Sequence, residues 1–265
     1  MVSMNRFNAL LLNLGHALDH LFLLIFATAV ASIASDFGLQ RWEDLMPYTA
    51  GAFVMFGLGS IPAGRLGDLW GRRRMMLVFY FGMGLAALAV ALTQTPLQMA
   101  VALTVLGLFS SIYHPVGIPF LVQGSKTPGL TIGINGLAGN MGIALAALST
   151  GFWVQYFGWR MAFIAPAVLS IVCGYFFWRH APRESAPPAE KNVTPVHLPR
   201  HLALSTVVVM IGSAIASSLL FNFTTNGNAQ LLAERLDGLV YEPVMLGLLL
   251  AIIVCRLLLE KKESV

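Results

Sequence analysis

Gly64-Arg65-Leu66-Gly67-Asp68-Leu69-Trp70-Gly71-Arg72-Arg73-Arg74 is the stretch on which the interpretation of this sequence depends. It is short, strongly charged and rich in glycine, and it joins two apolar runs, residues 45–63 and 75–93. Nearly all of the remaining chain is apolar. A charged turn between two long apolar runs is typical of a membrane protein whose turn stays outside the hydrocarbon core.

The composition supports the same interpretation. The 265 residues are 57% hydrophobic and only 11% charged, and the mean hydropathy is +0.75. A soluble domain carries about a quarter charged residues, whereas an apolar run of roughly 20 residues can cross a bilayer. We therefore predict an all-α polytopic membrane protein. The net charge of +4 does not indicate nucleic-acid binding, because loops on one side of a membrane explain it better.

Apolar runs predict seven spans and a weaker eighth. The eighth is interrupted by Glu242 and Pro243, and its uninterrupted part, residues 244–255, has only twelve residues. Two cysteines, Cys173 and Cys255, lie far apart in such runs and are expected to be buried thiols. The predicted spans are residues 9–35, 45–63, 75–93, 97–122, 130–154, 161–178, 202–223 and 239–259.

The distribution of Lys and Arg predicts a cytoplasmic N-terminus. With that orientation, thirteen of the sixteen Lys and Arg residues fall in cytoplasmic segments, and three, Arg41, Arg160 and Arg235, fall outside. Such an excess on the cytoplasmic side is the rule for multi-pass proteins. We expect the chain to lie in a lipid bilayer, the bacterial inner membrane.

A proline-rich segment, residues 180–201, divides the chain. It holds five prolines and charges of both signs, which predicts an extended cytoplasmic linker. The linker separates a bundle of six spans, residues 1–179, from residues 202–265. The latter would form the start of an incomplete second bundle, with one or two further spans.

The charged stretch resembles the signature Gly-x-x-x-Asp-Arg-x-Gly-Arg-Arg of the major facilitator superfamily, which lies between the second and third spans. Leu69 stands where the family has a basic residue. Six spans followed by a cytoplasmic linker also resemble that family. The resemblance implies a secondary transporter that alternates access between two six-span halves, with this stretch as a gating loop. The matching residues are Gly64, Asp68, Gly71, Arg72 and Arg73.

Three shorter stretches resemble the fosmidomycin-resistance-type branch of this family. They are HALDH at residues 16–20, GLFSSIYHP at residues 107–115 and GLAGNMG at residues 136–142. This resemblance implies proton-driven export of a small organic molecule. The chain lacks the Gly-Pro pair that the family's antiporters carry on the fifth span, and its fourth span lacks their buried arginine.

Asp19 is the only acidic residue inside a clearly predicted span. A carboxylate facing lipid there costs at least about 2.5 kcal/mol, so Asp19 should face a cavity. At about 100° per residue, His16, Asp19 and His20 share roughly a third of the helix circumference, and Asn13 lies on the same face. A buried carboxylate beside histidines can take and release a proton near neutral pH. The alternative is an Asp–His hydrogen bond that only holds helices together.

The fourth span adds two candidate residues. Ser110 and His114 belong to a stripe of small and polar residues, and Pro115 and Pro119 should loosen the helix there. Both would line the same cavity, with His114 as a second protonatable group or a substrate contact; the alternative is a stripe used for helix packing. Tyr113 is expected to point away from His114 and to be a packing residue.

Small residues on the fifth span predict close helix contact. Ala138, Gly142 and Ala146 recur at intervals of four and therefore share one face. Packing is the expected role of this face.

We predict a proton-coupled secondary transporter that exports a small organic molecule and is not an enzyme. No catalytic triad, paired carboxylates or nucleotide-binding pattern is present, and we expect no cofactor or bound metal. Because the second bundle looks incomplete, three alternatives remain open. The chain could be a truncated product without transport activity, or a half completed by self-association or a second chain. It could also be a non-transporting binding or regulatory membrane protein.

Overall fold

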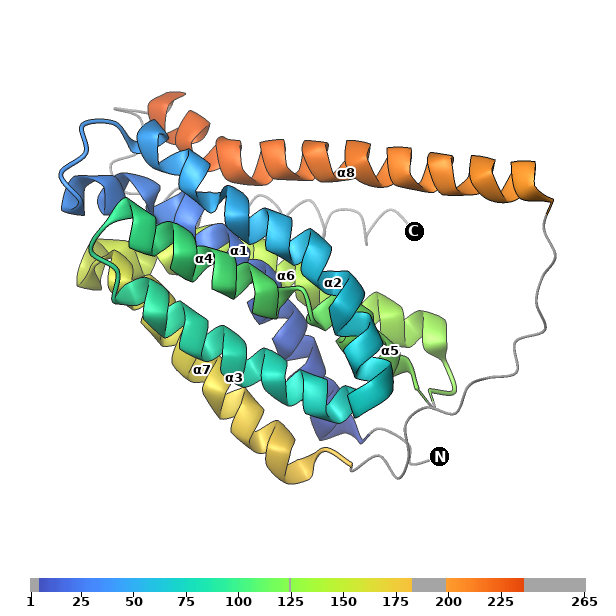
Figure 1. The fold of residues 1–265 in the computed structure, drawn as a ribbon. Helices are drawn as coiled ribbons and strands as arrows, with labels where there is room; N and C mark the ends of the chain where they lie inside the picture. Colours follow the sequence, from blue (N-terminus) through green and yellow to red (C-terminus); the bar gives the residue numbers. More distant parts are fainter. Residues whose placement is uncertain (1–4, 124, 183–198, 236–265) are drawn as a thin grey trace, which may run out of the picture.

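The computed structural model describes residues 5–123, 125–182 and 199–235, and every regular element in these ranges is helical. Seven of the helical segments are long and apolar enough to cross a membrane, which confirms the all-α polytopic class. Figure 1 shows most of them packed side by side as a bundle. The elements are α1 (Arg6–Asp36), the 3-10 helix η1 (Trp42–Thr49), α2 (Ala50–Trp70), α3 (Arg72–Ala91), α4 (Pro96–Ser110), the π-helix η2 (Tyr113–Gly117), α5 (Ile118–Val122), α6 (Pro128–Phe157), α7 (Trp159–His180) and α8 (Arg200–Arg235).

The six helical segments of the bundle coincide with the first six predicted spans but extend beyond most of them. The second span ends at residue 63 by its apolar run, whereas α2 continues to Trp70. An apolar run marks the part of a helix that lies in hydrocarbon. The end of an apolar run does not mark the end of the helix, because a helix can continue into water through charged residues.

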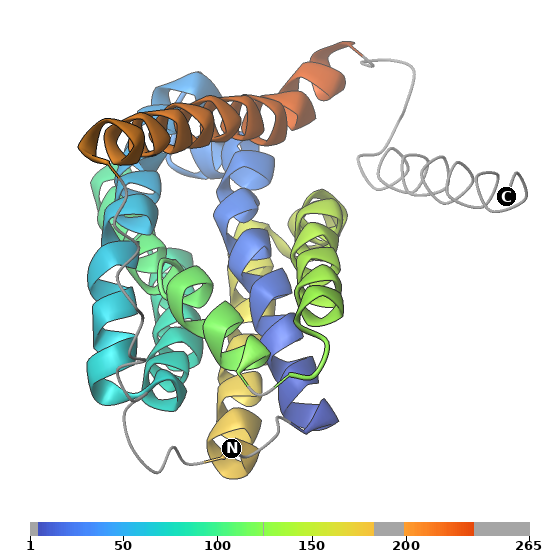
Figure 2. The same cartoon turned by 90° about the vertical axis from the view of Figure 1, so that its right-hand side faces the viewer.

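Helix α1 lies inside the bundle, where it packs mainly against α6 and also against α7 (Figure 2). Two other close pairs complete the arrangement, α3 with α7 and α2 with α4. Large apolar side chains such as Leu58, Ile61 and Leu85 are exposed on the outside. In a membrane protein these surfaces face lipid, so exposure there is not a defect.

Glycines allow the closest helix contacts. A Cβ on Gly107 of α4 would overlap the backbone of Ala52 on α2, and one on Gly142 of α6 would overlap the backbone of Ala17 on α1. Gly142 and Ala146 are buried, which confirms their packing role. Gly139, not Ala138, is the third small residue of that buried face.

Two Gly→Ala substitutions on α6 should have opposite effects. Gly142→Ala should lower the free energy of unfolding by about 1–3 kcal/mol, because the new methyl group meets backbone that cannot rotate away. Gly133→Ala is the matched control: nothing lies within 4 Å of a Cβ there. Alanine should stabilise that helix position by about 0.5–1 kcal/mol. Thermal unfolding in detergent would measure both, and equal effects would contradict the packing described here.

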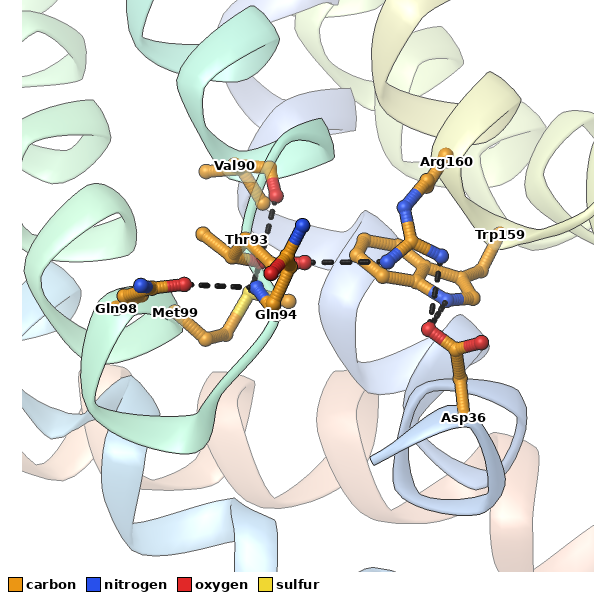
Figure 3. Close-up of polar contacts among 8 residues, drawn as sticks. All are labelled: Asp36, Val90, Thr93, Gln94, Gln98, Met99, Trp159 and Arg160. Carbon is orange, nitrogen blue, oxygen red and sulfur yellow. Dashed lines mark hydrogen bonds and ion pairs between the residues drawn. The ribbon is translucent and has the colours of Figure 1, made fainter. Parts of the chain in front are cut away.

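A polar cluster joins three helix ends at the η1 end of the bundle (Figure 3). Arg160, at the start of α7, donates to Asp36 Oδ2 at 2.8 Å and to the Thr93 carbonyl at 3.1 Å. The Trp159 indole N–H donates to the same Asp36 oxygen at 3.3 Å, and the Arg160 guanidinium lies 4.3 Å from the centre of the Trp159 ring. These contacts hold the end of α1 against the start of α7 and the residues that follow α3.

The charged stretch at residues 64–74 is a tight turn, not an extended loop. Gly64 and Asp68 lie in the last turns of α2, and Arg72 already begins α3. Only Gly71 is non-helical. Its φ is 95°, a backbone conformation that residues other than glycine rarely adopt. One glycine with a positive φ is thus enough to end one helix and begin the next.

The charged side chains of this turn bind within the bundle. Arg72 lies 3.8 Å from Asp68 and also donates to the Pro119 carbonyl at the end of the fourth span. Arg73 donates through Nε to the Ala181 carbonyl at 3.0 Å and through Nη2 to that of Trp178. Positive charge near the carbonyl end of a helix is favourable, so Arg73 caps α7.

The two charges should therefore differ in their effect on stability. Asp68→Asn should change the unfolding free energy by less than about 1 kcal/mol, because the pair with Arg72 is long and half-exposed. Arg73→Ala removes charge-assisted bonds to two carbonyls and should cost about 1.5–3 kcal/mol. Thermal unfolding of the purified variants measures both. A large loss in Asp68→Asn would instead reveal a further partner of this carboxylate.

The seventh predicted span is a helix, but it lies outside the bundle. Helix α8 crosses over the end of the bundle that carries η1 (Figures 1 and 2), and its described side chains are largely exposed. Most of the predicted linker and the whole of the weak eighth span lie outside the described residues.

Candidate functional site

Asp19 is fully buried near the middle of α1 and faces the fourth span. The Ser110 hydroxyl, at the end of α4, donates to Asp19 Oδ1. The other oxygen, Oδ2, has no hydrogen-bond partner and lies 3.5 Å from His114 Nε2. A buried carboxylate oxygen without a donor is costly unless a proton or another cation occupies the place beside it.

Three histidine rings surround this carboxylate. His16 and His20 project from the same face of α1 as Asp19, and their Nε2 atoms are 3.1 Å apart. The His114 ring meets both edge-on, with centroids 5.1 Å from His16 and 5.5 Å from His20. The structure thus brings together Asp19, His16, His20, Ser110 and His114.

A π-helical turn positions the residues from the fourth span. The turn covers Tyr113–Gly117, where Pro115 prevents regular helical hydrogen bonding. Tyr113 was expected to point away from His114 and to be a packing residue. It is buried, but its ring lies edge-on to His114 with 5.9 Å between centroids, and it stacks on His16 at 4.7 Å. The expectation was wrong because α1 crosses η2 closely enough for adjacent side chains of η2 to contact it.

A hydrogen-bonded network that we did not predict supports the histidines. Asn135 on α6 accepts a bond from His16 Nδ1–H at its backbone carbonyl, at 2.8 Å. Its side-chain amide donates to Tyr113 Oη at 2.8 Å and to Asn13 Oδ1 at 2.9 Å. Asn13 therefore contributes as a partner of Asn135. Asn135 carries a polar amide side chain within an otherwise apolar predicted span, and this feature could have identified it as a site residue from the sequence.

Gly139 explains how α6 approaches this network. A Cβ at this position would come within 2.6 Å of the His16 ring. Because Gly139 and Asn135 are one turn apart on α6, the first makes room for the imidazole and the second binds it. The fifth span thus contributes to the site as well as to packing.

An apolar cavity of about 700 Å³ begins one helical turn away, toward the η1 end. Phe22 follows Asp19 by one turn on α1, and Leu106 precedes Ser110 by one turn on α4; both line the cavity. Phe53 also lines it, and Phe56, one turn further along α2, packs against His114. The volume lies within the range of about 300–1,000 Å³ usual for small-molecule sites.

The five signature residues lie elsewhere, at the opposite end of the bundle from η1. Gly64 packs against Pro115 of η2, so α2 connects that end to the histidine cluster. Gly71, Arg72 and Arg73 form the turn and the helix caps described above.

Comparison with known proteins gives a family match over most of the chain. The sequence model described as Major Facilitator Superfamily matches residues 12–261. A gallate transporter of Pseudomonas putida is 26% identical over 149 residues, which are 56% of this chain and 33% of that protein. A tetracenomycin C resistance and export protein of Streptomyces glaucescens is 28% identical over 150 residues, 54% of this chain and 28% of that protein. The chain thus matches about a third of the length of these relatives.

Solved structures show the same fold. A bacterial homologue of the human lysosomal transporter Spinster superposes with a TM-score of 0.58 and 14% identity, over 72% of this chain and 47% of that one. The POT family transporter PepTSo also gives 0.58, with 17% identity, over 82% of this chain and 48% of that one. The matched part of this chain therefore corresponds to nearly half of each of these two proteins. The chain is an integral multi-pass membrane protein that belongs to the Major Facilitator Superfamily.

Proposed function

We propose that this chain supplies the N-terminal half of a secondary transporter that exports small organic molecules, driven by protons. Family membership supports transport, and several relatives are named for organic, mostly aromatic compounds such as gallate, puromycin and tetracenomycin C. The apolar cavity lined by Phe22, Phe26 and Phe53 suits such cargo. Two relatives are named as resistance proteins for antibiotics, which favours export.

The observation that carries the proposal is the place of Asp19. Its carboxylate is fully buried at mid-helix, one oxygen lacks a donor, and the apolar cavity begins one turn away. The titratable groups around it are His16 and His20 on its own helix and His114 and Tyr113 on η2. A proton added to Asp19 removes a buried charge, and its loss restores the attraction to a protonated His114. Either step changes how α1 packs against η2.

The transport unit requires a second six-span half, because the solved relatives of this fold are about twice as long as the matched part of this chain. Transport then proceeds by alternating access around a site between the halves. A second half can come from another chain, from a second copy or from a longer form of this one. The excess of Lys and Arg at one side supports an N-terminus in the cytoplasm and insertion in an inner membrane.

A flux assay tests this proposal. The chain, alone and after cross-linking, would be reconstituted in proteoliposomes with a pH gradient, and transport of puromycin and gallate would be followed. We expect gradient-dependent flux that falls at least about tenfold in Asp19→Asn, because the neutral amide cannot exchange a proton. Asp44→Asn, the same change at an exposed position of η1, should leave flux unchanged.

Three outcomes would contradict the proposal. Flux in Asp19→Asn equal to that of the unaltered chain would exclude coupling through this carboxylate. Flux without a pH gradient would exclude proton drive. Binding of either compound without flux, in both the free and the cross-linked chain, would favour a binding or regulatory membrane protein instead.

A further inference from the structure

Three imidazoles converge on one point in the middle of the bundle. His16 and His20 are four residues apart on α1, so they project from one face of the helix, and His114 approaches from η2. Each ring offers one nitrogen atom, and these three nitrogens lie within 4.8 Å of one another. Nitrogens this close repel one another if two or more rings are charged. The arrangement is suited to a shared cation.

A fourth donor, the Asp19 carboxylate, lies beside the His114 ring. Asp19 Oδ2 is buried, has no hydrogen-bond partner and lies 3.5 Å from His114 Nε2. Its other oxygen accepts from the Ser110 hydroxyl, which fixes the orientation of the carboxylate. The orphan oxygen and the three imidazoles together offer three nitrogens and one oxygen.

The protonation state of His16 is set by its surroundings. Its Nδ1 lies 2.8 Å from the Asn135 carbonyl, which can only accept, so the proton is on Nδ1. In the neutral ring, Nε2 then carries a lone pair that faces His20 Nε2, 3.1 Å away. Histidine ligands of metal ions are usually oriented in this way, by a carbonyl or carboxylate bound to the second ring nitrogen.

The separations fit tetrahedral coordination. Donors held 2.0–2.1 Å from a tetrahedral metal ion lie about 3.4 Å apart. The His16–His20 pair and the His114–Asp19 pair are separated by 3.1 Å and 3.5 Å, and the three imidazole nitrogens lie within 4.8 Å of one another, so rotation of the side chains would have to bring the two pairs closer together. Imidazole and carboxylate donors suit zinc and similar transition metals, whereas magnesium and calcium prefer oxygen alone.

We propose that His16, His20, His114 and Asp19 form a binding site for one divalent transition-metal ion of the zinc type. The His114 side chain is 40% exposed and provides the route of entry. A bound ion would tie α1 to η2 and neutralise the buried carboxylate. The site stands independently of whether the chain transports protons, because it requires only these four side chains.

Metal titration of the purified, untagged full chain in detergent tests the site without substrate or gradient. Zn²⁺ binding would be measured by calorimetry, and Co²⁺ would serve as the spectroscopic probe. We expect one ion per chain and the intense visible absorption of tetrahedral Co²⁺. His114→Ala and Asp19→Asn should each weaken Zn²⁺ binding by at least about tenfold and remove the tetrahedral Co²⁺ spectrum.

His201→Ala removes an exposed histidine on α8 and should leave binding unchanged. Circular dichroism would confirm that each variant remains helical, and His16→Gln gives a second ligand change of similar size. Absence of Zn²⁺ binding or an octahedral Co²⁺ spectrum would overturn the proposal. So would a Zn²⁺ affinity in folded His114→Ala and Asp19→Asn equal to that of the unaltered chain.

Discussion

The hydrogen bond from Ser110 to Asp19 joins α4 to α1 through two residues that are 91 positions apart in the sequence, and it does so in the middle of the bundle. In hydrocarbon, a carboxylate must be surrounded by protein groups, because no water can solvate it there. The α1–α4 contact, the π-helical turn and the ring of histidines all follow from this requirement. Each brings a polar group to within reach of Asp19 without exposing it to lipid.

Close packing makes this arrangement possible. Gly139 admits the His16 ring, and Gly142, one turn further, lets α6 touch the backbone of α1. The same helix then supplies Asn135, whose carbonyl and amide bind His16 and Tyr113. The polar site and the small-residue face are therefore one feature of α6, and a change in either affects the other.

The sequence predicted the six spans of the bundle and the shared helix face of His16, Asp19 and His20, because hydrophobic runs and helical spacing are local properties. It did not predict the role of Tyr113 or Asn135, since both depend on how closely α1 crosses η2 and α6. The charged stretch at residues 64–74 identified the family correctly, although a single left-handed glycine, Gly71, forms its turn. Such tertiary contacts are not visible in periodicity.

We propose that Asp19 exchanges a proton as cargo enters the neighbouring cavity. This proposal is tested most directly by adding puromycin to the purified chain in weakly buffered detergent and counting the protons released. We expect release of about one proton per chain and none from Asp19→Asn. Binding of puromycin with no proton change, or the same release from both proteins, would contradict it.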